Sequence, residues 1–265
     1  MRPVPFDVRD GAVLVEFPEA SEADANRASV TLAARLRERP GVHDAIPGAR
    51  SLLVLFDPRR LSHDTLRDAI DAAPPAGPAE GGTRRTLTVP AAYDGPDLDD
   101  LARRSGLSAA EVARRHGGAE YRVAFLGFAP GFAYLTGLPP ELCAPRLPTP
   151  RTRVPAGSLA IGGCYTGIYP GASPGGWRLI GRTTLRLLDP GADPPALLRA
   201  GDRVRFEAVS AGELPPPASP PERRVADGRA PILRIASPGL SATIQGVPGG
   251  GRGLGASGIP PGGAI

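Results

Sequence analysis

FLGFAPGFAYLTGLPPELCAPRLPTPRTRVPAGSLAIGGCYTGIYPGASPGGWRLIGRT, residues 125–183, is the stretch that decides the fold class. Short apolar runs alternate in it with glycine and proline, a pattern typical of many short strands joined by tight turns. Glycines let the main chain approach a ligand closely, and prolines hold a loop in shape before binding. The stretch therefore predicts a β-barrel whose rim forms a rigid pocket.

The flanking residues extend this barrel. Downstream, GDRVRFEAV (201–209) alternates Val204 and Phe206 with charged residues, as a strand does when one face packs on the core. Upstream, residues 96–118 predict two short helices, and Ser108 begins the second of them with an S-x-x-E capping box. We expect one mainly-β domain over residues 83–210, with a helical lead-in.

Residues 1–72 have a different pattern and predict a small α+β domain. The expected elements are a strand at 11–17, a helix at 21–39, a strand at 51–56 and a short helix that begins after Ser62. Two stretches rich in proline, 73–82 and 211–231, are expected to be linkers. The remaining residues, 232–265, are too few to fold alone.

All 31 basic residues are arginines, because the chain contains no lysine. Without lysine there can be no Walker A loop, Schiff base or biotinyl-lysine on this chain. The net charge of +4 is too small to indicate nucleic-acid binding by itself. Residues 96–116 have the spacing of a DNA-reading helix-turn-helix, but alanines stand where base contacts would lie, so we expect no nucleic-acid partner.

No run of about 18–20 apolar residues is present and the N-terminus lacks the pattern of a secretory signal, so we expect a cytoplasmic protein that does not enter a membrane. Cys143 and Cys164 form no CxxC pair and have no nearby histidine, which indicates neither a zinc site nor a disulfide framework. We expect two reduced thiols. With only three histidines in the chain, we expect no His-rich metal site either.

Arg151 and Arg153 are the strongest candidates for binding an anion. If PRTRVP is extended, the two guanidinium groups point to the same side and can grip a carboxylate or a phosphate. Arg146 and Arg182 could supplement them in orienting a small anionic substrate. The alternative is that these arginines bridge loops to acidic or backbone partners.

Other residues would shape this pocket or transfer a proton. His116 ends a helix beside the glycine-rich stretch and could act as a general acid or base, or its cation could stabilise the end of that helix. Hydroxyls and backbone N–H groups of PAGS and SPGGW could form an anion nest, or these segments could be plain tight turns. Besides the arginines, the residues expected around the substrate are Ser158, Tyr169, Ser173, Gly175, Gly176 and Trp177.

Five motifs resemble the family of the 5-oxoprolinase B subunit, also known as carboxyltransferase subdomains C and D, allophanate hydrolase subunit 1 or Kip-type kinase inhibitor. They are F-L-G-F-A-P-G-F-A-Y-L, P-R-T-R-V-P-A-G-S, T-G-I-Y-P, S-P-G-G-W and I-G-R-T. The resemblance covers nearly all of residues 1–210 and implies an α+β N-terminal domain followed by a mainly-β, cyclophilin-like barrel domain. One departure is Tyr165, where the family tends to carry glutamine.

The tail at residues 232–265 resembles the opening of the partner family, that of the 5-oxoprolinase C subunit or carboxyltransferase subdomains A and B. It then departs into a glycine-rich run, so the chain looks like a shortened fusion. The resemblance implies that the partners are proteins similar to the A and C subunits of 5-oxoprolinase, and that the chain is inactive without them.

The resemblance implies three functions. The first is a subunit of an ATP-dependent 5-oxoprolinase, which converts 5-oxo-L-proline, ATP and water to L-glutamate, ADP and phosphate, with ATP bound by or shared with a partner protein. The second is an element of a biotin-dependent carboxyltransferase related to urea amidolyase, with biotin carried on another protein. The third is a Kip-type inhibitor of a histidine kinase. We expect the first.

Overall fold

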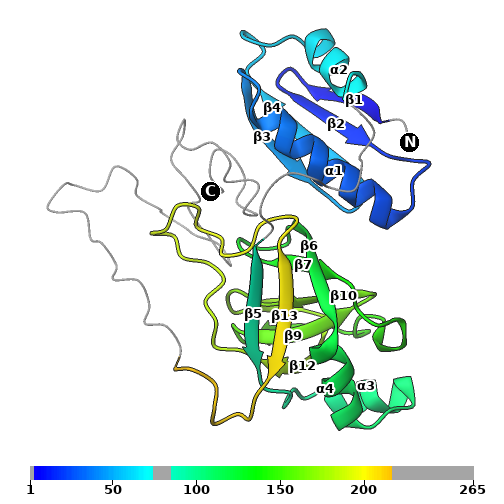
Figure 1. Cartoon of the computed structure of the whole chain (residues 1–265), viewed down its shortest axis with the longest axis vertical. Helices are drawn as coiled ribbons and strands as arrows, with labels where there is room; N and C mark the ends of the chain where they lie inside the picture. Colours follow the sequence, from blue (N-terminus) through cyan, green and yellow to red (C-terminus); the bar gives the residue numbers. More distant parts are fainter. Residues whose placement is uncertain (1–2, 74–84, 217–265) are drawn as a thin grey trace, which may run out of the picture.

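The computed structural model describes residues 3–73 and 85–216, whose two larger sheets have separate hydrophobic cores (Figure 1). The architecture is mixed α/β, with few helices and one large curled sheet. The tail at 232–265 lies outside the described residues, as do residues 74–82 of the first expected linker and 217–231 of the second.

The N-terminal part is a four-stranded antiparallel sheet of order β1-β2-β4-β3, covered by two helices. Its elements are β1 Val4–Arg9, β2 Ala12–Glu16, α1 Glu22–Arg37, β3 Val42–Pro47, β4 Ser51–Phe56 and α2 His63–Asp71. The predicted cap is confirmed at Ser62, whose hydroxyl accepts a hydrogen bond from the Thr65 amide at 3.1 Å. One apolar face of α1, the helix predicted at 21–39, is buried, as Leu32 and Leu36 show. The sequence did not predict β1 or β3.

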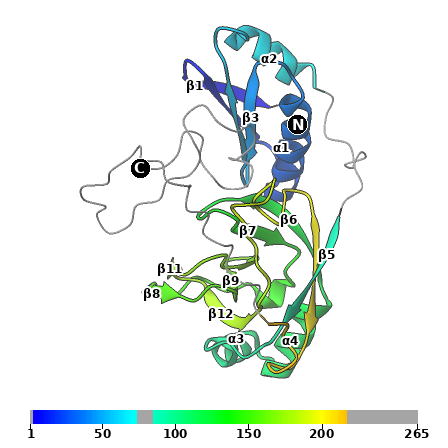
Figure 2. The same cartoon turned by 90° about the vertical axis from the view of Figure 1, so that its left-hand side faces the viewer.

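The second sheet has seven strands in the order β12-β9-β10-β7-β6-β13-β5 and curls into a half-barrel (Figure 2). Its strands are β5 Thr86–Ala91, β6 Glu120–Leu126, β7 Ala133–Thr136, β9 Ser158–Gly162, β10 Tyr165–Ile168, β12 Arg178–Arg182 and β13 Arg203–Ala208. Two further strands, β8 Arg151–Val154 and β11 Ser173–Gly175, pair with each other outside it. As predicted, Val204 and Phe206 of β13 face the core.

The two edges of this sheet meet just beyond β5. Ala92 and Arg182 exchange backbone hydrogen bonds of 2.9 and 2.8 Å, which join β5 to β12 by one bridge. The close approach requires glycine at position 181, because a Cβ there would lie 2.2 Å from the Ala92 carbonyl oxygen. The bridge between Ala92 and Arg182, called the seam below, thus closes the curled sheet, and position 181 beside it has no room for a side chain.

Two helices, α3 Leu98–Ser105 and α4 Ala109–Gly118, follow the seam, and a 3-10 turn, η1 Pro140–Leu142, lies farther along the chain. Ser108 caps α4 as predicted, since its hydroxyl accepts from the Glu111 amide at 3.2 Å. The Glu111 side chain does not complete the expected capping box in this structure. It accepts hydrogen bonds from Arg114 and Arg115 instead, and these lower its pKa to about 2.

The expectation of two reduced thiols is wrong in this structure. Cys143 and Cys164 form a disulfide, with their Cα atoms 4.5 Å apart. The cause is the antiparallel bridge between their neighbours Ala144 and Gly163, which sets the two cysteines side by side although 21 positions separate them.

None of the helices within residues 3–73 and 85–216 has the length and apolar composition that a membrane crossing requires.

Candidate functional site

A cavity of about 350 Å³ opens where the segment after β5 meets β8, β9 and β12. Four of the predicted residues line it: Arg151, Arg153, Ser158 and Arg182. The other lining residues are Asp94, Gly95, Pro96, Pro155, Ala156, Leu179 and Gly181. The structure therefore brings three of the four candidate arginines to one cavity beside the barrel seam.

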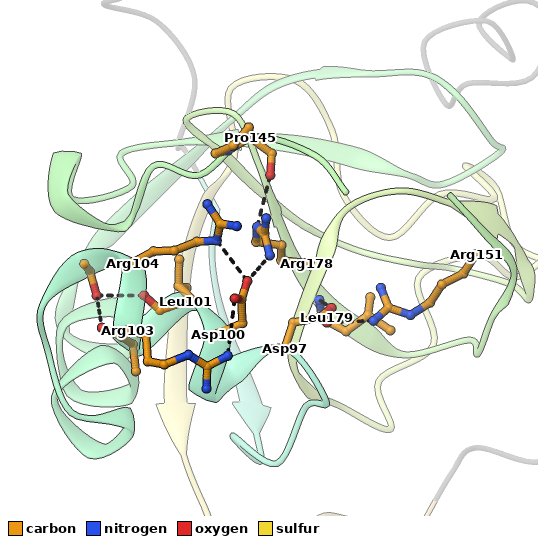
Figure 3. A network of polar contacts seen from close by, with 11 residues as sticks. Asp97, Asp100, Leu101, Arg103, Arg104, Pro145, Arg151, Arg178 and Leu179 are labelled. Atoms are coloured by element: carbon orange, nitrogen blue, oxygen red, sulfur yellow. Dashed lines mark hydrogen bonds and ion pairs between the residues drawn. The ribbon is translucent and has the colours of Figure 1, made fainter. Parts of the chain in front are cut away.

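Arg151 is held in place by Asp97, a residue that the sequence did not predict for the site (Figure 3). The Asp97 carboxylate is buried and accepts from Arg151 Nη2 at 2.7 Å through one oxygen and from the Leu179 amide at 2.7 Å through the other. Because Asp97 also donates its own amide to the Leu179 carbonyl, its position is fixed by the barrel. Arg151 is thus oriented before any ligand arrives.

Arg153 differs from Arg151 because it is exposed and forms no hydrogen bond or ion pair within residues 3–73 and 85–216. Arg182 is intermediate, since it forms an ion pair of 2.9 Å with Asp94 and its side chain is about half exposed. As the two-residue spacing predicted, Arg151 and Arg153 line the same cavity. The cavity therefore has one fixed guanidinium group and one that is available to a ligand.

A second ion-pair network lies beside Asp97 (Figure 3). Arg178 is almost fully buried, contacts the Asp100 carboxylate and donates to the Pro145 carbonyl at 3.1 Å. Asp100 also accepts from Arg104 at 3.0 Å. A sequence signal for this network exists in the acidic start of α3, Asp-Leu-Asp-Asp. Because the chain has arginines and no lysines, arginines are the expected partners of these carboxylates.

The remaining predicted pocket residues do not line the cavity. Tyr169 and Trp177 are buried in an aromatic cluster around Phe132, with ring centroids 5.2 and 5.3 Å from it. The indole covers Gly162, where a Cβ would come within 2.6 Å of the ring. These two aromatic residues stabilise the barrel wall, so the expectation that they contact the substrate in the same pocket as the arginines is not met.

The polar residues of SPGGW and Arg146 also lie apart from the cavity lining. Ser173 and Gly175 belong to β11, opposite β8, and the Gly176 carbonyl accepts from the Leu147 amide at 2.7 Å. Arg146 is exposed beside Tyr134, and it partly offsets the rise in the pKa of that phenol that burial causes. This segment forms ordinary strand and turn contacts in the structure.

The structure argues against a catalytic role for His116, which is fully buried. Thr166 donates its hydroxyl hydrogen to the Ala160 carbonyl, so it must accept from His116 Nε2 at 2.9 Å. Nδ1 then accepts from the Tyr93 hydroxyl at 2.8 Å, which defines a neutral tautomer. Burial lowers the pKa of His116 to about 3. His116 is a hydrogen-bonded core residue that lies outside the cavity lining.

Comparison with known proteins gives consistent matches. A family model described as carboxyltransferase domain, subdomain C and D, matches residues 6–198. The B subunit of 5-oxoprolinase from Escherichia coli O157:H7 is 42% identical over 209 residues, which are 75% of this chain and 93% of that protein. The B subunit of 5-oxoprolinase from Bacillus subtilis (strain 168) is 38% identical over 217 residues, which are 76% of this chain and 90% of that protein.

A solved structure agrees with these relatives. The crystal structure of TTHA0988 in space group P6522 superposes with a TM-score of 0.68 at 41% sequence identity. The match covers 78% of this chain but only 41% of TTHA0988, so this chain spans less than half of that longer protein. The family model and the two curated relatives show that the chain belongs to the carboxyltransferase subdomain C and D family, which is the family of the 5-oxoprolinase B subunit.

Proposed function

We propose that this chain is the B subunit of an ATP-dependent 5-oxoprolinase, and that its arginine cavity binds the carboxylate of 5-oxo-L-proline. The observation that carries the proposal is that Arg151 and Arg153 line one cavity. Asp97 fixes the first, and the second has no partner among the residues that the structure describes. The two curated relatives are named as B subunits of 5-oxoprolinase, and that name supports the reaction class.

The expected chemistry is the opening of a lactam. ATP phosphorylates the lactam oxygen and leaves as ADP. One water then adds to the activated carbon and the C–N bond breaks, which opens the ring to an acyl phosphate of glutamate and frees the amine. A second water hydrolyses this acyl phosphate to L-glutamate and phosphate. In this proposal Arg153 would pair with the substrate carboxylate, and Arg151 would supply a second guanidinium group whose position does not change on binding. Both groups would position the substrate rather than take part in bond making.

The cavity fits the small substrate better than the nucleotide. Its volume of about 350 Å³ is at the lower end of the range of about 300–1,000 Å³ that is usual for ligand sites. The chain also lacks the lysine that a Walker A loop needs. We therefore assign ATP to a partner protein or to a site shared with one, and we expect proteins similar to the A and C subunits of 5-oxoprolinase as the partners.

The test is ATP-dependent release of L-glutamate from 5-oxo-L-proline by this chain mixed with its partners of the A and C types. The proposal expects turnover that disappears when this chain is omitted. Arg153→Gln should raise the KM for 5-oxoproline at least ten-fold, whereas Arg114→Gln, at an exposed ion pair on α4, should leave KM unchanged. Unchanged turnover without this chain would refute the proposal.

Biotin-dependent carboxyl transfer is the second candidate, because the matching family model is described as a carboxyltransferase domain. The absence of lysine means that biotin would have to arrive on another protein. Transfer of a labelled carboxyl group from a separate carboxybiotin carrier to urea would favour this candidate, and no transfer in the presence of all partners would exclude it.

A further inference from the structure

The disulfide between Cys143 and Cys164 joins two segments that differ in how firmly they are held. Cys143 lies between Leu142 and Ala144, and both of these neighbours are buried in the barrel core. Cys164 lies in the turn between β9 and β10 and is exposed. One cysteine is therefore anchored by the core on both sides, whereas the other lies where a molecule from solvent can reach it.

The backbone keeps the two cysteines close together independently of the bond between their sulfur atoms. The Ala144 amide donates to the Gly163 carbonyl at 3.0 Å, and the Gly163 amide donates to the Ala144 carbonyl at 2.8 Å. Because this bridge involves a direct neighbour of each cysteine, the two thiols stay near each other after reduction. The chain has no third cysteine, so within one chain a broken bond can only re-form between the same two residues.

The exposed end of the disulfide adjoins a contact between the two larger sheets. Tyr165 follows Cys164 and donates its hydroxyl hydrogen to Glu22 Oε1 in the first turn of α1. These three residues also line one cavity of about 330 Å³. Helix α1 packs against β6 of the half-barrel (Figure 1). The disulfide thus restrains a turn that carries a hydrogen bond between the N-terminal part and the barrel.

Another contact between the two parts does not involve this turn. Asn26 of α1 is buried and donates to the Ala124 carbonyl of β6 at 2.9 Å. Because β6 carries neither cysteine, this hydrogen bond does not depend on the state of the disulfide. A change at the cysteines would therefore loosen the first turn of α1 without separating the two parts.

We propose that Cys143 and Cys164 form a reversible thiol–disulfide site, and that its reduction weakens the contact between Tyr165 and Glu22. Exposed disulfides are reduced more readily than buried structural ones, and a dithiol is the class of reductant that suits this site. None of the four residues lines the arginine cavity, so the proposal is independent of the reaction assigned to that cavity.

The exchange proceeds in two steps. A thiolate of the dithiol attacks Cys164 Sγ, which forms a mixed disulfide, breaks the bond to Cys143 and leaves Cys143 as a thiolate. The second thiolate of the dithiol then attacks its own sulfur in the mixed disulfide and releases Cys164 as a thiolate. The two protons of the dithiol end on the two cysteines, and the dithiol is oxidised to a cyclic disulfide.

The first experiment tests whether the folded chain exchanges with a dithiol. The full chain is treated with oxidised glutathione, incubated with or without millimolar dithiothreitol in the absence of denaturant, alkylated with iodoacetamide and weighed by mass spectrometry. We expect no label before reduction, two labels after it, and no label after a second oxidation. Labelling before reduction, or reduction that requires a denaturant, would overturn the proposal, the latter because the bond would then be purely structural.

The second experiment compares hydrogen exchange in the first two turns of α1 between the oxidised and the reduced chain. A helix end frays more when a contact that holds it is lost, so exchange at residues 22–29 should become about three-fold faster or more on reduction. Tyr165→Phe lacks the donor hydroxyl and should exchange fast in both states. Unchanged exchange on reduction of the wild type, or equal acceleration in Tyr165→Phe, would refute the link to α1.

Two variants serve as controls, while the comparison of oxidised with reduced wild type needs no variant. The double variant Cys143→Ser/Cys164→Ser should exchange like the reduced wild type and should not respond to dithiothreitol. A response would mean that another group senses the reductant, against the proposal. Tyr121→Phe removes a hydroxyl that bonds to the His116 carbonyl inside the barrel, so it should keep the redox response of the wild type. Thermal unfolding checks that each variant is folded.

Discussion

The buried His116 predicts a specific loss of stability in acid. Its neutral ring accepts from Tyr93 and donates to Thr166, and burial lowers its pKa to about 3, compared with about 6.5 in an unfolded chain. Because the folded pKa is depressed, the contribution to stability is fully present above about pH 6.5 and is lost as the pH falls towards 3. Below pH 6.5 the unfolded chain takes up a proton at this residue and the folded chain does not.

The magnitude follows from linkage. At pH 5, about 1.5 units below the unfolded pKa of about 6.5, protonation of the histidine stabilises the unfolded chain. At about 1.36 kcal/mol per unit, this stabilisation amounts to roughly 2 kcal/mol relative to pH 8. This figure does not depend on the folded pKa as long as that pKa lies well below 5. Other groups also titrate in this interval, so a variant that lacks only the histidine is needed to isolate the effect.

The assay is urea unfolding of wild type and His116→Gln at pH 8, 7, 6 and 5, followed by circular dichroism. The glutamine variant should be less stable at pH 8, because the packing against Tyr121 and Phe206 is altered, but it should lose about 2 kcal/mol less than wild type on going to pH 5. Equal losses in the two proteins would refute the view that His116 is held neutral in the core. In the assembled enzyme, the variant should retain its kcat at pH 8 if His116 has no catalytic role.

Three other changes test the seam, the site and a helix cap by urea unfolding at pH 7. Gly181→Ala places a Cβ 2.2 Å from the Ala92 carbonyl oxygen and should cost about 1–3 kcal/mol or more, whereas a loss under 0.5 kcal/mol would mean that the seam adapts. Asp97→Asn removes the charge that holds Arg151 and should cost about 2 kcal/mol, less than the roughly 3–5 kcal/mol of a fully buried pair because Arg151 keeps some contact with solvent. Ser108→Ala removes the cap of α4 and should lower the unfolding free energy by about 1 kcal/mol. An unchanged midpoint of urea unfolding would show that the cap does not stabilise the fold.

Local patterns were the part of the structure that the sequence could predict. The caps at Ser62 and Ser108 depend on a hydroxyl and an amide three residues apart, and the alternation of Val204 and Phe206 depends on the geometry of one strand. Such signals lie within one element, so they can be found in the sequence alone. The short strands β3 and β11 have no such pattern and were missed.

Contacts between distant segments could not be predicted, and they decide which candidate residues form the site. Asp97 and Arg151 are 54 positions apart, and nothing near Asp97 indicates that it reaches the barrel. His116 and Thr166 are 50 positions apart, so a histidine at a helix end gave no sign that it would be buried. Arginine spacing predicted a shared cavity for Arg151 and Arg153, but only the tertiary structure shows that one of them is already paired.

The same segment of the chain closes the barrel and forms part of the arginine cavity. After β5 the chain continues along β12, because Ala92 bonds to Arg182, Gly95 donates to the Ile180 carbonyl, and Asp97 bonds to Leu179 in both directions. This irregular segment after β5 forms a wall of the cavity and places the Asp97 carboxylate beside Arg151.

A change in the seam should therefore affect stability and ligand binding together. Gly181→Ala should lower both the unfolding free energy and the affinity for 5-oxoproline, because it displaces the segment that carries Asp97. Ser108→Ala lowers stability through a helix end that does not line the cavity, so it should leave that affinity unchanged. A seam variant that binds ligand normally would show that the position of Arg151 does not depend on closure of the barrel.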